Sequence, residues 1–365
     1  CAVKRIYQVN RLRQISDPTW RVDEVPEWRG FVLELIEPGG YVLSRGADLF
    51  AAKKLGGSMR RIGRIPLPFW REWISKIEIG RRLFRLIYFN VVPLEGNRYF
   101  VTFDKMMGII GDQQFNLIPT DRPFRILRQG ICYSDGKLFF GEYISNAERG
   151  AVRILEANLK QKNPSLKIAH SFSPGEVRHI HRIQCDPFSN EIWCMTGDKP
   201  DESQIFCSKD NFCSIELVGG GDESWRCVSP IFTERFIYYA TDSEFSTNAI
   251  YRIDRANGCR EHVCEIDGPV YYSILVGDRM FFATVAEGCP SQAELVASLW
   301  HLDHKKEKAT ASKLFSYRKD WLSPKWFLPG MLTFPSRYDG CTDLFLFNGL
   351  GLFGADHKIF SLSKS

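Results

Sequence analysis

A short pattern of large apolar residues followed by a polar or acidic tip recurs along the chain. Each copy begins with aromatic or aliphatic residues and ends, a few positions later, on a polar side chain. The clearest copies are Tyr99–Asp104, Phe139–Tyr143, Ile192–Asp198, Tyr238–Asp242, Phe281–Glu287 and Phe345–Asn348, with a weaker first copy at Tyr41–Ser44. Short runs of this composition, bounded by turn residues, predict buried β-strands.

Turn signals place a hairpin on either side of these copies. Ser134–Gly136 and Gly277–Asp278 precede two of them, and Lys209–Asn211 and Asp254–Gly258 follow two others. Such Gly-, Asn- and Asp-containing turns are typical of β-hairpins. Two hairpins make a four-stranded unit, and units of about 40–55 residues have the size of propeller blades.

The repeated units predict an all-β fold, a β-propeller of seven four-stranded blades. The units begin near Gly30, Phe89, Gln129, Val177, Trp225, Pro269 and Pro329. Because the first unit is the weakest, six blades are the alternative, and a β-sandwich is the competing fold. We expect a single domain over residues 1–365, in which residues 1–29 form an N-terminal segment.

Residues 67–87 break the repeat and predict a basic amphipathic helical insertion between the first two blades. Phe69, Trp73 and Ile77 follow one another at a spacing of four, as on one face of a helix. Ten basic residues against two acidic ones lie between Lys53 and Arg85, which predicts a surface for a polyanion or an anionic membrane. The alternative is that the apolar face packs on the ring. No nucleic-acid-binding motif accompanies the charge, so we expect no nucleic-acid partner.

Propeller topology brings the ends of the second strands and the starts of the first strands to one face. The ends of the second strands supply Asp104, Glu142, Asp198, Asp242 and Glu287. The starts of the first strands supply Arg85, Arg125, Arg178, His179, His181, Arg182, Arg226, Tyr271 and Tyr272. Carboxylates accept hydrogen bonds from hydroxyls, and arginines bind carboxylate, sulfate or phosphate, so this rim suits an acidic saccharide. The alternative is that the charges pair with one another and hold the ring closed.

From this rim we select candidate residues for each role. The catalytic candidates are Glu142, His179, His181, Asp198, Asp242, Tyr271 and Glu287, and the substrate-binding candidates are Arg178, Arg182, Trp225, Arg226 and Tyr272. On a strand, His179 and His181 point to one side and Arg178 and Arg182 to the other. We interpret the two histidines as hydrogen-bonded channel residues; the alternatives are that one of them is a general base or that both ligate a divalent metal. We expect that the protein requires no cofactor. The alternative is a divalent metal held by His179 and His181.

The composition indicates the compartment in which the protein is expected. The chain has eleven cysteines without paired metal-binding spacing, which favours free thiols in a reducing compartment. A bond between Cys185 and Cys194, which flank a tight turn, is the alternative. No apolar run is long enough to span a membrane. The chain begins with Cys1 rather than Met, so an upstream segment is not excluded. We expect a cytoplasmic protein, with a peripheral position at the inner membrane face as a variant of that location.

The segment Ile205–Phe212 resembles a worn Asp-box, the Ser-x-Asp-x-Gly-x-Thr-Trp turn of sialidase-like (BNR-repeat) propellers, because Ser208 and Asp210 match it. Gly141-Glu142-Tyr143, Arg178–His181 and Thr196–Asp198 are similar to uncharacterised propellers of that class associated with surface-polysaccharide metabolism. The resemblance spans roughly residues 125–320.

The resemblance implies a set of sialidase-like roles. A tyrosine nucleophile paired with a glutamate would be Tyr271 or Tyr272 with Glu287 or Glu142, beside an aspartic acid, and the three arginines would be Arg178, Arg182 and Arg226. Arg64-Ile65-Pro66 matches only the end of the family's Phe-Arg-Ile-Pro motif, and on an outer strand, so sialidase activity itself is not implied. The Asp-box is structural and says nothing of catalysis.

Two function classes follow from the rim and the resemblance together. The first is a carbohydrate-active enzyme, a glycoside hydrolase or a polysaccharide lyase that acts on an acidic oligo- or polysaccharide. The second is a non-catalytic glycan-binding or scaffold propeller in surface-polysaccharide metabolism.

Overall fold

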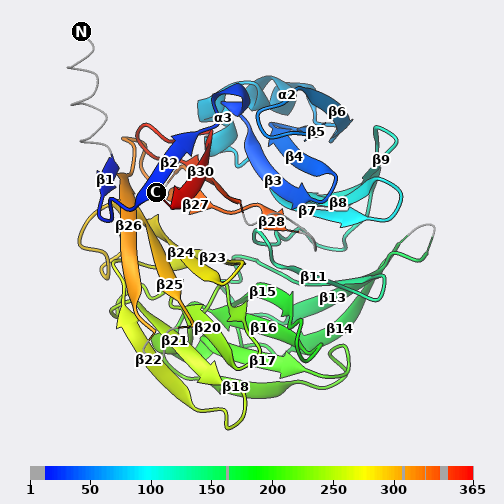
Figure 1. The fold of residues 1–365 in the computed structure, drawn as a ribbon. Coiled ribbons are helices and arrows are strands. Elements are labelled where there is room, and N and C mark those ends of the chain that lie inside the picture. Colours follow the sequence, from blue (N-terminus) through cyan, green and yellow to red (C-terminus); the bar gives the residue numbers. More distant parts are fainter. Residues whose placement is uncertain (1–12, 162–163, 306–308, 325, 338–343, 365) are drawn as a thin grey trace.

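The computed structural model describes residues 13–161, 164–305, 309–324, 326–337 and 344–364. Antiparallel four-stranded sheets stand in a ring, each with its first strand near the axis and its last strand at the rim (Figure 1). The colours of Figure 1 run once around this ring, from blue at the top through green at the bottom to red. The structure confirms the predicted β-propeller, and it has seven blades.

The first four blades each contain four strands in the order of the chain. Blade 1 has β3 (Val32–Glu37), β4 (Gly40–Arg45), β5 (Asp48–Ala52) and β6 (Met59–Arg64). Blade 2 has β7 (Tyr88–Leu94), β8 (Arg98–Phe103), β9 (Met106–Gly111) and β10 (Gln114–Leu117). Blade 3 has β11 (Ile131–Ser134), β12 (Lys137–Gly141), β13 (Val152–Asn158) and β14 (Leu166–Phe172). Blade 4 has β15 (His179–Cys185), β16 (Ile192–Gly197), β17 (Gln204–Ser208) and β18 (Glu216–Gly220).

The remaining blades complete the ring. Blade 5 has β19 (Ile231–Phe232), β20 (Phe236–Ala240), β21 (Ala249–Asp254) and β22 (Arg260–Glu265). Blade 6 has β23 (Val270–Val276), β24 (Arg279–Ala286), β25 (Val296–Asp303) and β26 (Ala311–Arg318). Blade 7 has β27 (Gly330–Thr333), β29 (Phe345–Leu350) and β30 (Lys358–Lys364) from the end of the chain. Short 3-10 turns are η1 (Pro26–Trp28), η2 (Pro200–Glu202) and η3 (Glu223–Trp225).

The N-terminal part of the chain closes the ring. The outermost strand of blade 7 is β2 (Trp20–Glu24), which pairs antiparallel with β30. Figure 1 shows the blue β2 beside the red β30. In addition, β1 (Arg13–Ile15) extends the rim of blade 6 by pairing with β26, and β28 (Ser336–Arg337) lies parallel to β3. Backbone hydrogen bonds therefore tie the two ends of the ring together, a link that the sequence analysis did not predict.

The repeated apolar pattern corresponds to the second strand of each blade. Strands β8, β12, β16, β20, β24 and β29 are buried along almost their whole length. They are buried because each lies between the faces of two neighbouring blades. A strand that is buried on both faces appears in the sequence as a continuous apolar run. The outermost strands, such as β10 and β18, are largely exposed and leave little apolar signal.

Phe140 illustrates the packing between blades 2 and 3. Its ring is fully buried and stacks on Phe100 at 6.1 Å and on Phe124 at 6.3 Å between ring centroids. We expect Phe140→Ala to lower the free energy of unfolding by about 3–5 kcal/mol, through lost contacts and the cavity left behind. Urea unfolding measures this. Leu217→Ala, at an exposed position on β18, is the control and is expected to change stability by about 0.5 kcal/mol or less. Equal effects at both positions would contradict this account.

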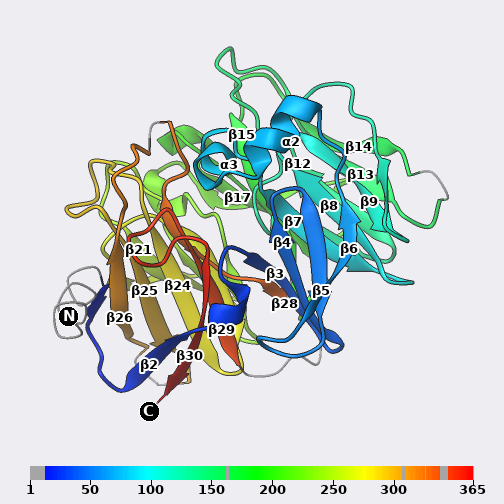
Figure 2. The ribbon, with the colours of Figure 1, turned by 90° about the horizontal axis from the view of Figure 1, so that it is seen from above.

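The insertion between blades 1 and 2 is two short helices rather than one. They are α2 (Phe69–Ser75) and α3 (Glu78–Leu83), and they stand on one face of the ring (Figure 2). Ile77 separates them with an extended backbone (φ −99°, ψ 126°). Gly80 lets α3 fold back on α2, because a Cβ there would lie 2.7 Å from the carbonyl oxygen of Ile74.

The two helices bury charge and expose apolar side chains, the reverse of the packing alternative given above. Arg81 and Arg82 are buried, and Arg82 contacts Asp320 at 5% side-chain exposure. Phe69, Trp70 and Trp73 face solvent. The helical hairpin is therefore attached to the ring through ion pairs and through Ile74, which packs against the core, and most of its large apolar residues are exposed.

The cysteines and the helices bear on two further expectations. The nine cysteines that the structure describes are all free thiols. Cys185 lies opposite Ile192 and Cys194 opposite Ile183 in the β15–β16 ladder, so the two cysteines do not face each other. Among the described residues, no helix has the length and apolar character needed to cross a membrane.

Candidate functional site

A cavity of about 180 Å³ lies at the axis of the ring, on the face where second strands end and first strands begin. We call this the pocket face and the cavity the central pocket. Its lining residues are Arg85, Phe89, Arg125, Leu127, Arg128, Tyr143, His181, Asp198, Arg226, Val228, Asp242, Tyr271, Tyr272, Glu287, Leu328, Pro329 and Met331. Seven of the twelve candidate residues selected from the sequence line it: His181, Asp198, Arg226, Asp242, Tyr271, Tyr272 and Glu287.

Irregularities in the first strands direct three side chains into the central pocket. The antiparallel register shifts between Tyr88 and Asn90 in β7, between Ile180 and Arg182 in β15, and between Val270 and Tyr272 in β23. The extra residues are Phe89, His181 and Tyr271, and all three line the pocket. A β-bulge re-aims side chains in this way, and bulges are frequent beside active sites.

Tyr271 and Glu287 form a hydrogen-bonded pair in blade 6. The Tyr271 hydroxyl donates to Oε1 of Glu287, which follows the end of β24. Burial, together with the charges of Glu287 and Asp242, raises the pKa of Tyr271 well above its usual value. Burial also raises the pKa of Glu287, although the bond from Tyr271 partly opposes it. The phenol therefore keeps its proton at rest, next to a carboxyl group that is more basic than an exposed one.

Arg226 bridges two carboxylates of different character. Its Nη2 lies 3.2 Å from Asp198 Oδ1, and its Nε lies 3.1 Å from Asp242 Oδ2. Burial raises the pKa of Asp242 well above its ordinary value despite the Arg226 charge, and Glu287 and Asp198 add to the rise. Burial opposes ionisation of Asp198 too, but hydrogen bonds from His179 and His181 outweigh it and hold the pKa of Asp198 far below its usual range. Burial thus shifts Asp242 toward its protonated form, and the histidine hydrogen bonds shift Asp198 toward its ionised form.

The two histidines and Asp198 form a compact triangle. His179 Nε2 lies 3.1 Å from His181 Nε2 and 3.1 Å from Asp198 Oδ1, and His181 Nε2 lies 3.5 Å from the same oxygen. Burial lowers the pKa of His181 to about 4, so its ring is neutral near neutral pH. Zinc–nitrogen distances of about 2.0–2.1 Å give tetrahedral edges of roughly 3.3 Å, so the triangle has the size of a metal-ligand set.

The lining arginines differ in their partners. Arg125 Nη2 lies 2.8 Å from Asp104, and Arg128 Nη1 lies 2.6 Å from Glu34. Arg85 has no carboxylate partner in the part of the chain that the structure describes. Its backbone is in the left-handed region (φ 53°), which is uncommon for a side chain of this size and found at functional sites. Arg85 is thus the lining cation available to an anionic ligand.

Two further candidates touch the site from its edge. Arg178 Nη1 donates to Asp198 Oδ2 at 2.8 Å, so it reaches the same carboxylate as the histidines rather than pointing away from them. His179 Nδ1 lies 3.2 Å from the carbonyl oxygen of Ile144, which fixes its ring. Both residues support the pocket without lining it.

Three of the candidates lie outside the central pocket. Glu142 is fully buried and accepts hydrogen bonds from Arg122 and Arg153, which lower its pKa against the effect of burial. Arg182 donates to Ser229 Oγ at 2.7 Å and borders a separate hollow. Trp225 stacks on Tyr239 and lies under Arg260, at 4.0 Å from the guanidinium carbon. These three side chains do not line the central pocket, and each has a partner elsewhere, so the structure does not bring them together with the other candidates.

Tyr143 is a lining residue that the sequence analysis did not select. It follows Glu142 directly, and the two side chains point in opposite directions, as neighbours in extended chain do. A backbone bridge with Arg125 fixes Tyr143, and its ring centroid lies 4.1 Å from that of His179. Burial raises the pKa of Tyr143 to about 12. The alternation of side chains after Gly141 was the available signal.

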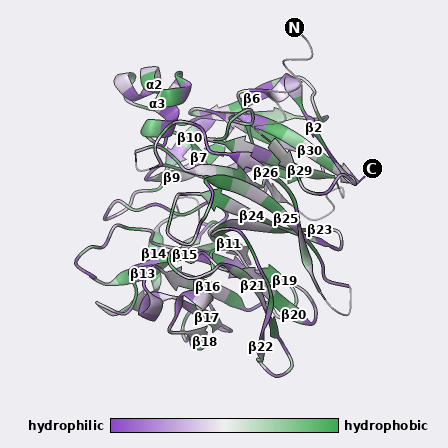
Figure 3. Ribbon diagram, turned by 90° about the vertical axis from the view of Figure 1, so that its left-hand side faces the viewer, coloured by the Kyte–Doolittle hydropathy of each residue, from purple (hydrophilic) through white to green (hydrophobic). Residues whose placement is uncertain are grey.

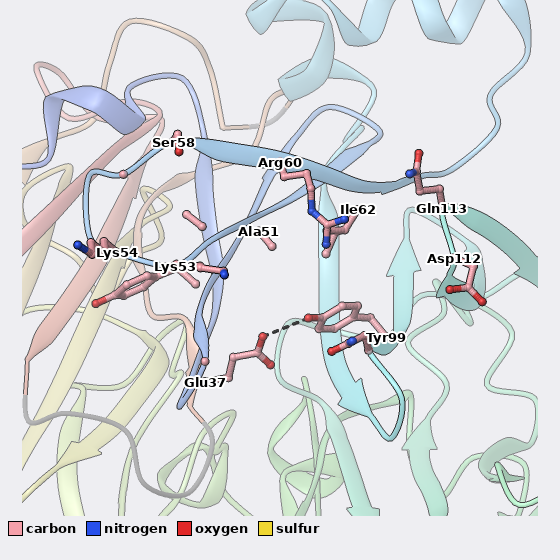
Figure 4. A pocket seen from close by; sticks show the side chains of 15 residues that line it. Glu37, Ala51, Lys53, Lys54, Ser58, Arg60, Ile62, Tyr99, Asp112 and Gln113 are labelled. Atoms are coloured by element: carbon pink, nitrogen blue, oxygen red, sulfur yellow. Dashed lines mark hydrogen bonds between the residues drawn. The ribbon is translucent and has the colours of Figure 1, made fainter.

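A second hollow lies on the opposite face, between the turns of blades 1 and 2. Lys53, Lys54 and Arg60 border it, and Tyr99 donates a hydrogen bond of 3.1 Å to Glu37 across it (Figure 4). These cations belong to the basic segment 53–85, whose helical part stands on the pocket face. Strand β6 runs between the two faces, so the charge that is continuous in the sequence does not form one patch.

No protein-family model matches the chain. No curated protein matches it either. Among solved structures, an oligogalacturonate lyase from Vibrio parahaemolyticus superposes with a TM-score of 0.57 and 10% identity, over 95% of this chain and 94% of that one. The extracellular domain of a hybrid two-component system from B. thetaiotaomicron gives a TM-score of 0.58 and 11% identity, over 94% of this chain and 39% of that one.

These likenesses bear on the fold alone. The chain spans about two fifths of the length of the B. thetaiotaomicron proteins that it matches. At identities near a tenth, shared folds carry no assignment of residues or chemistry. The sialidase-like, Asp-box family stays a prediction. The chain is a seven-bladed β-propeller similar in fold to a propeller that acts on a saccharide.

Proposed function

We propose that the central pocket is the active site of an enzyme that hydrolyses a glycosidic bond of an acidic saccharide. The observation that carries this proposal is the Tyr271–Glu287 pair, which lies in one small cavity with Asp242. Two-step glycoside cleavage needs a nucleophile, a base that takes its proton, and an acid that protonates the leaving group. The hydrogen-bonded pair of Tyr271 and Glu287 supplies the first two, and Asp242, whose pKa is raised, supplies the third.

The roles follow from the protonation states. In the first step the phenolic oxygen of Tyr271 attacks the anomeric carbon, Glu287 takes the phenolic proton, and Asp242 gives its proton to the leaving oxygen. In the second step water attacks the same carbon, and Asp242 takes a proton from that water. The bond to Tyr271 breaks, and Glu287 returns the proton to the phenol. The raised pKa of Glu287 helps it to act as the base.

Arg85 is the group that we assign to the acidic function of the sugar. It lines the pocket, and no described carboxylate neutralises it. A guanidinium binds a carboxylate through two parallel hydrogen bonds. The cavity of about 180 Å³ is smaller than drug-sized pockets of about 300–1,000 Å³, which favours a single sugar residue at the reaction centre.

A lyase is the second candidate, and the His179–His181–Asp198 triangle favours it. A divalent cation held there would neutralise the carboxylate of a uronic acid and acidify the neighbouring C–H bond. His181 stays neutral down to about pH 4 and is available as a ligand. The fold shared with an oligogalacturonate lyase agrees with this alternative.

Incubation with acidic oligosaccharides tests the proposal and separates the candidates. Substrates containing uronic acids and sialic acids would be used, with and without a chelator. Hydrolysis is expected to release reducing ends without unsaturated products and to persist in the chelator. Products with the ultraviolet absorbance of an unsaturated sugar, lost in the chelator, would favour the lyase. Binding without turnover on all substrates would favour a glycan-binding propeller and overturn the enzymatic proposal.

Arg85→Gln is expected to raise KM by about tenfold or more and to change kcat less, because it removes a charge-assisted contact made before and during reaction. Steady-state kinetics with an acidic substrate measures this. The control is Lys105→Gln, an exposed cation of the pocket face outside the pocket. An equal rise in the KM of a neutral saccharide on Arg85→Gln substitution would contradict the assignment.

A further inference from the structure

All four exposed tryptophans of the described residues lie on the pocket face. Trp70 and Trp73 belong to α2, and Trp321 and Trp326 belong to the connection from β26 to β27. The other five tryptophans are buried or half-buried in the ring. Single exposed apolar residues are ordinary on protein surfaces, but a set confined to one face marks an interaction surface.

The helical hairpin contributes most of this surface. Phe69 is 81% exposed, and Ile77, Ile79, Leu83 and Phe84 are exposed beside it. Figure 3 shows α2 and α3 at the edge of the molecule with green, hydrophobic stretches. Arg82 pairs with Asp320, away from these residues. Arg71 pairs with Asp104, and its guanidinium carbon also lies 5.8 Å from the centroid of the Trp70 ring, so a cation stands beside the exposed tryptophan.

Loops from other blades extend the apolar surface around the pocket. Phe245 is exposed in the loop from β20 to β21, and Leu295 in the loop from β24 to β25. Trp321 is 76% exposed beyond the end of β26. These residues stand on loops of separate blades rather than along one groove. Phe245 and Leu295 each follow an exposed carboxylate, Glu244 and Glu294, whereas Trp321 lies near Arg318 in the sequence.

Exposed cations accompany the apolar residues. Arg45 ends β4, Lys105 lies in the loop from β8 to β9, and Arg318 ends β26, all on the pocket face. None of the three has a carboxylate partner among the residues that the structure describes. Lys76, between α2 and α3, lies 3.9 Å from Glu72. Loops of blades 3 to 5 on the same face expose carboxylates instead, such as Glu148, Asp201 and Glu244. The hairpin side of the pocket face, with blades 1 and 2 and the end of β26, is therefore the part that is complementary to anionic groups.

We propose that the hairpin side of the pocket face docks on an anionic lipid bilayer, with Phe69, Trp70 and Trp73 of the hairpin in the interfacial region. Tryptophan is suited to this region because its ring is apolar and its N–H is polar. Interfacial segments combine such residues with cations that meet the headgroups, and binding grows with buried apolar area and with charge. Docking needs no catalysis, so it stands independently of the function proposed above.

Co-sedimentation with lipid vesicles tests the docking. Wild-type protein is expected to sediment with vesicles that contain phosphatidylglycerol and less with pure phosphatidylcholine. The triple variant Phe69→Ser, Trp70→Ser, Trp73→Ser is expected to bind at least about tenfold more weakly. Trp321→Ser, in a separate loop, is a second variant expected to weaken binding. The control is Ile168→Ser with Leu217→Ser, at exposed positions on β14 and β18 at the side of the ring.

The charged residues give an independent readout. Arg45→Gln with Arg318→Gln is expected to weaken binding to the anionic vesicles and to leave binding to phosphatidylcholine unchanged. No sedimentation of wild-type protein with either vesicle would overturn the proposal, as would equal binding of the folded triple variant. A lipid-free dimer that the triple variant converts to a monomer would also overturn it, because the apolar surface would then belong to self-association.

Discussion

Glu287→Gln is expected to reduce kcat about a thousandfold. The amide can still accept the hydrogen bond from Tyr271, so the pocket keeps its shape. It cannot take the phenolic proton, and removal of a general base costs about 10²–10⁴ in rate. Steady-state kinetics on the acidic saccharide that the wild type cleaves would measure this loss.

Non-additivity would identify the pair as a unit. Tyr271→Phe is expected to cost about as much as Glu287→Gln, and the double variant little more than either, as for groups that act together. Glu294→Gln makes the same chemical change at an exposed position of the same loop and is expected to leave kcat unchanged. A Glu287→Gln variant with activity within about threefold of wild type would remove Glu287 from the mechanism.

The blades were predictable from sequence because their second strands are buried on both faces. Phe139, Phe140 and their counterparts have no solvent-facing side, so the apolar run is continuous and repeats once per blade. The closing strand β2 was not predictable in this way. Its pairing with β30 joins residues more than three hundred positions apart, and its burial pattern resembles that of any half-exposed segment.

The pocket was predictable in outline and not in detail. Topology alone brings the ends of second strands and the starts of first strands together, which placed Asp198, Asp242 and Glu287 at one site. Whether a given side chain faces the pocket depends on local backbone irregularity. The bulge at His181 turns Arg182 toward Ser229, and the alternation after Gly141 places Tyr143 in the pocket in place of Glu142.

Charge along the chain was the least reliable guide to surface properties. Ten basic residues between Lys53 and Arg85 predicted one basic surface. Strand β6 carries the chain from one face to the other, and Arg81 and Arg82 are buried. The exposed part of the insertion is therefore largely apolar, with Lys76 and Glu78 as its exposed charged residues. A sequence count cannot distinguish an exposed cation from one that pairs with a carboxylate of a distant blade, such as Asp320.

Asp242→Asn is expected to abolish most turnover and to remove a pH dependence. The proposed acid works only while protonated, and burial keeps its pKa well above the ordinary 3.8. In the wild type, kcat/KM is therefore expected to fall as the pH rises through this raised pKa. The asparagine variant cannot donate the proton, so it is expected to lose about 10²–10⁴ in rate and to show no such fall. Asp201→Asn, at an exposed position of the pocket face, is the control.

Asp242→Asn should also separate catalysis from stability. Near neutral pH it is expected to lower the activity and to raise the melting temperature. A folded-state pKa above the unfolded value contributes stability below about pH 3.8, and that stability is lost as the pH rises through the folded pKa. In Asp242→Asn the side chain carries no charge, so this loss of stability with rising pH does not occur. The melting temperature of Asp242→Asn minus that of the wild type is thus expected to increase from about pH 4 to about pH 7. A difference that shrinks over this range would mean that Asp242 is ionised in the folded protein, stabilised by Arg226, and unable to serve as the acid.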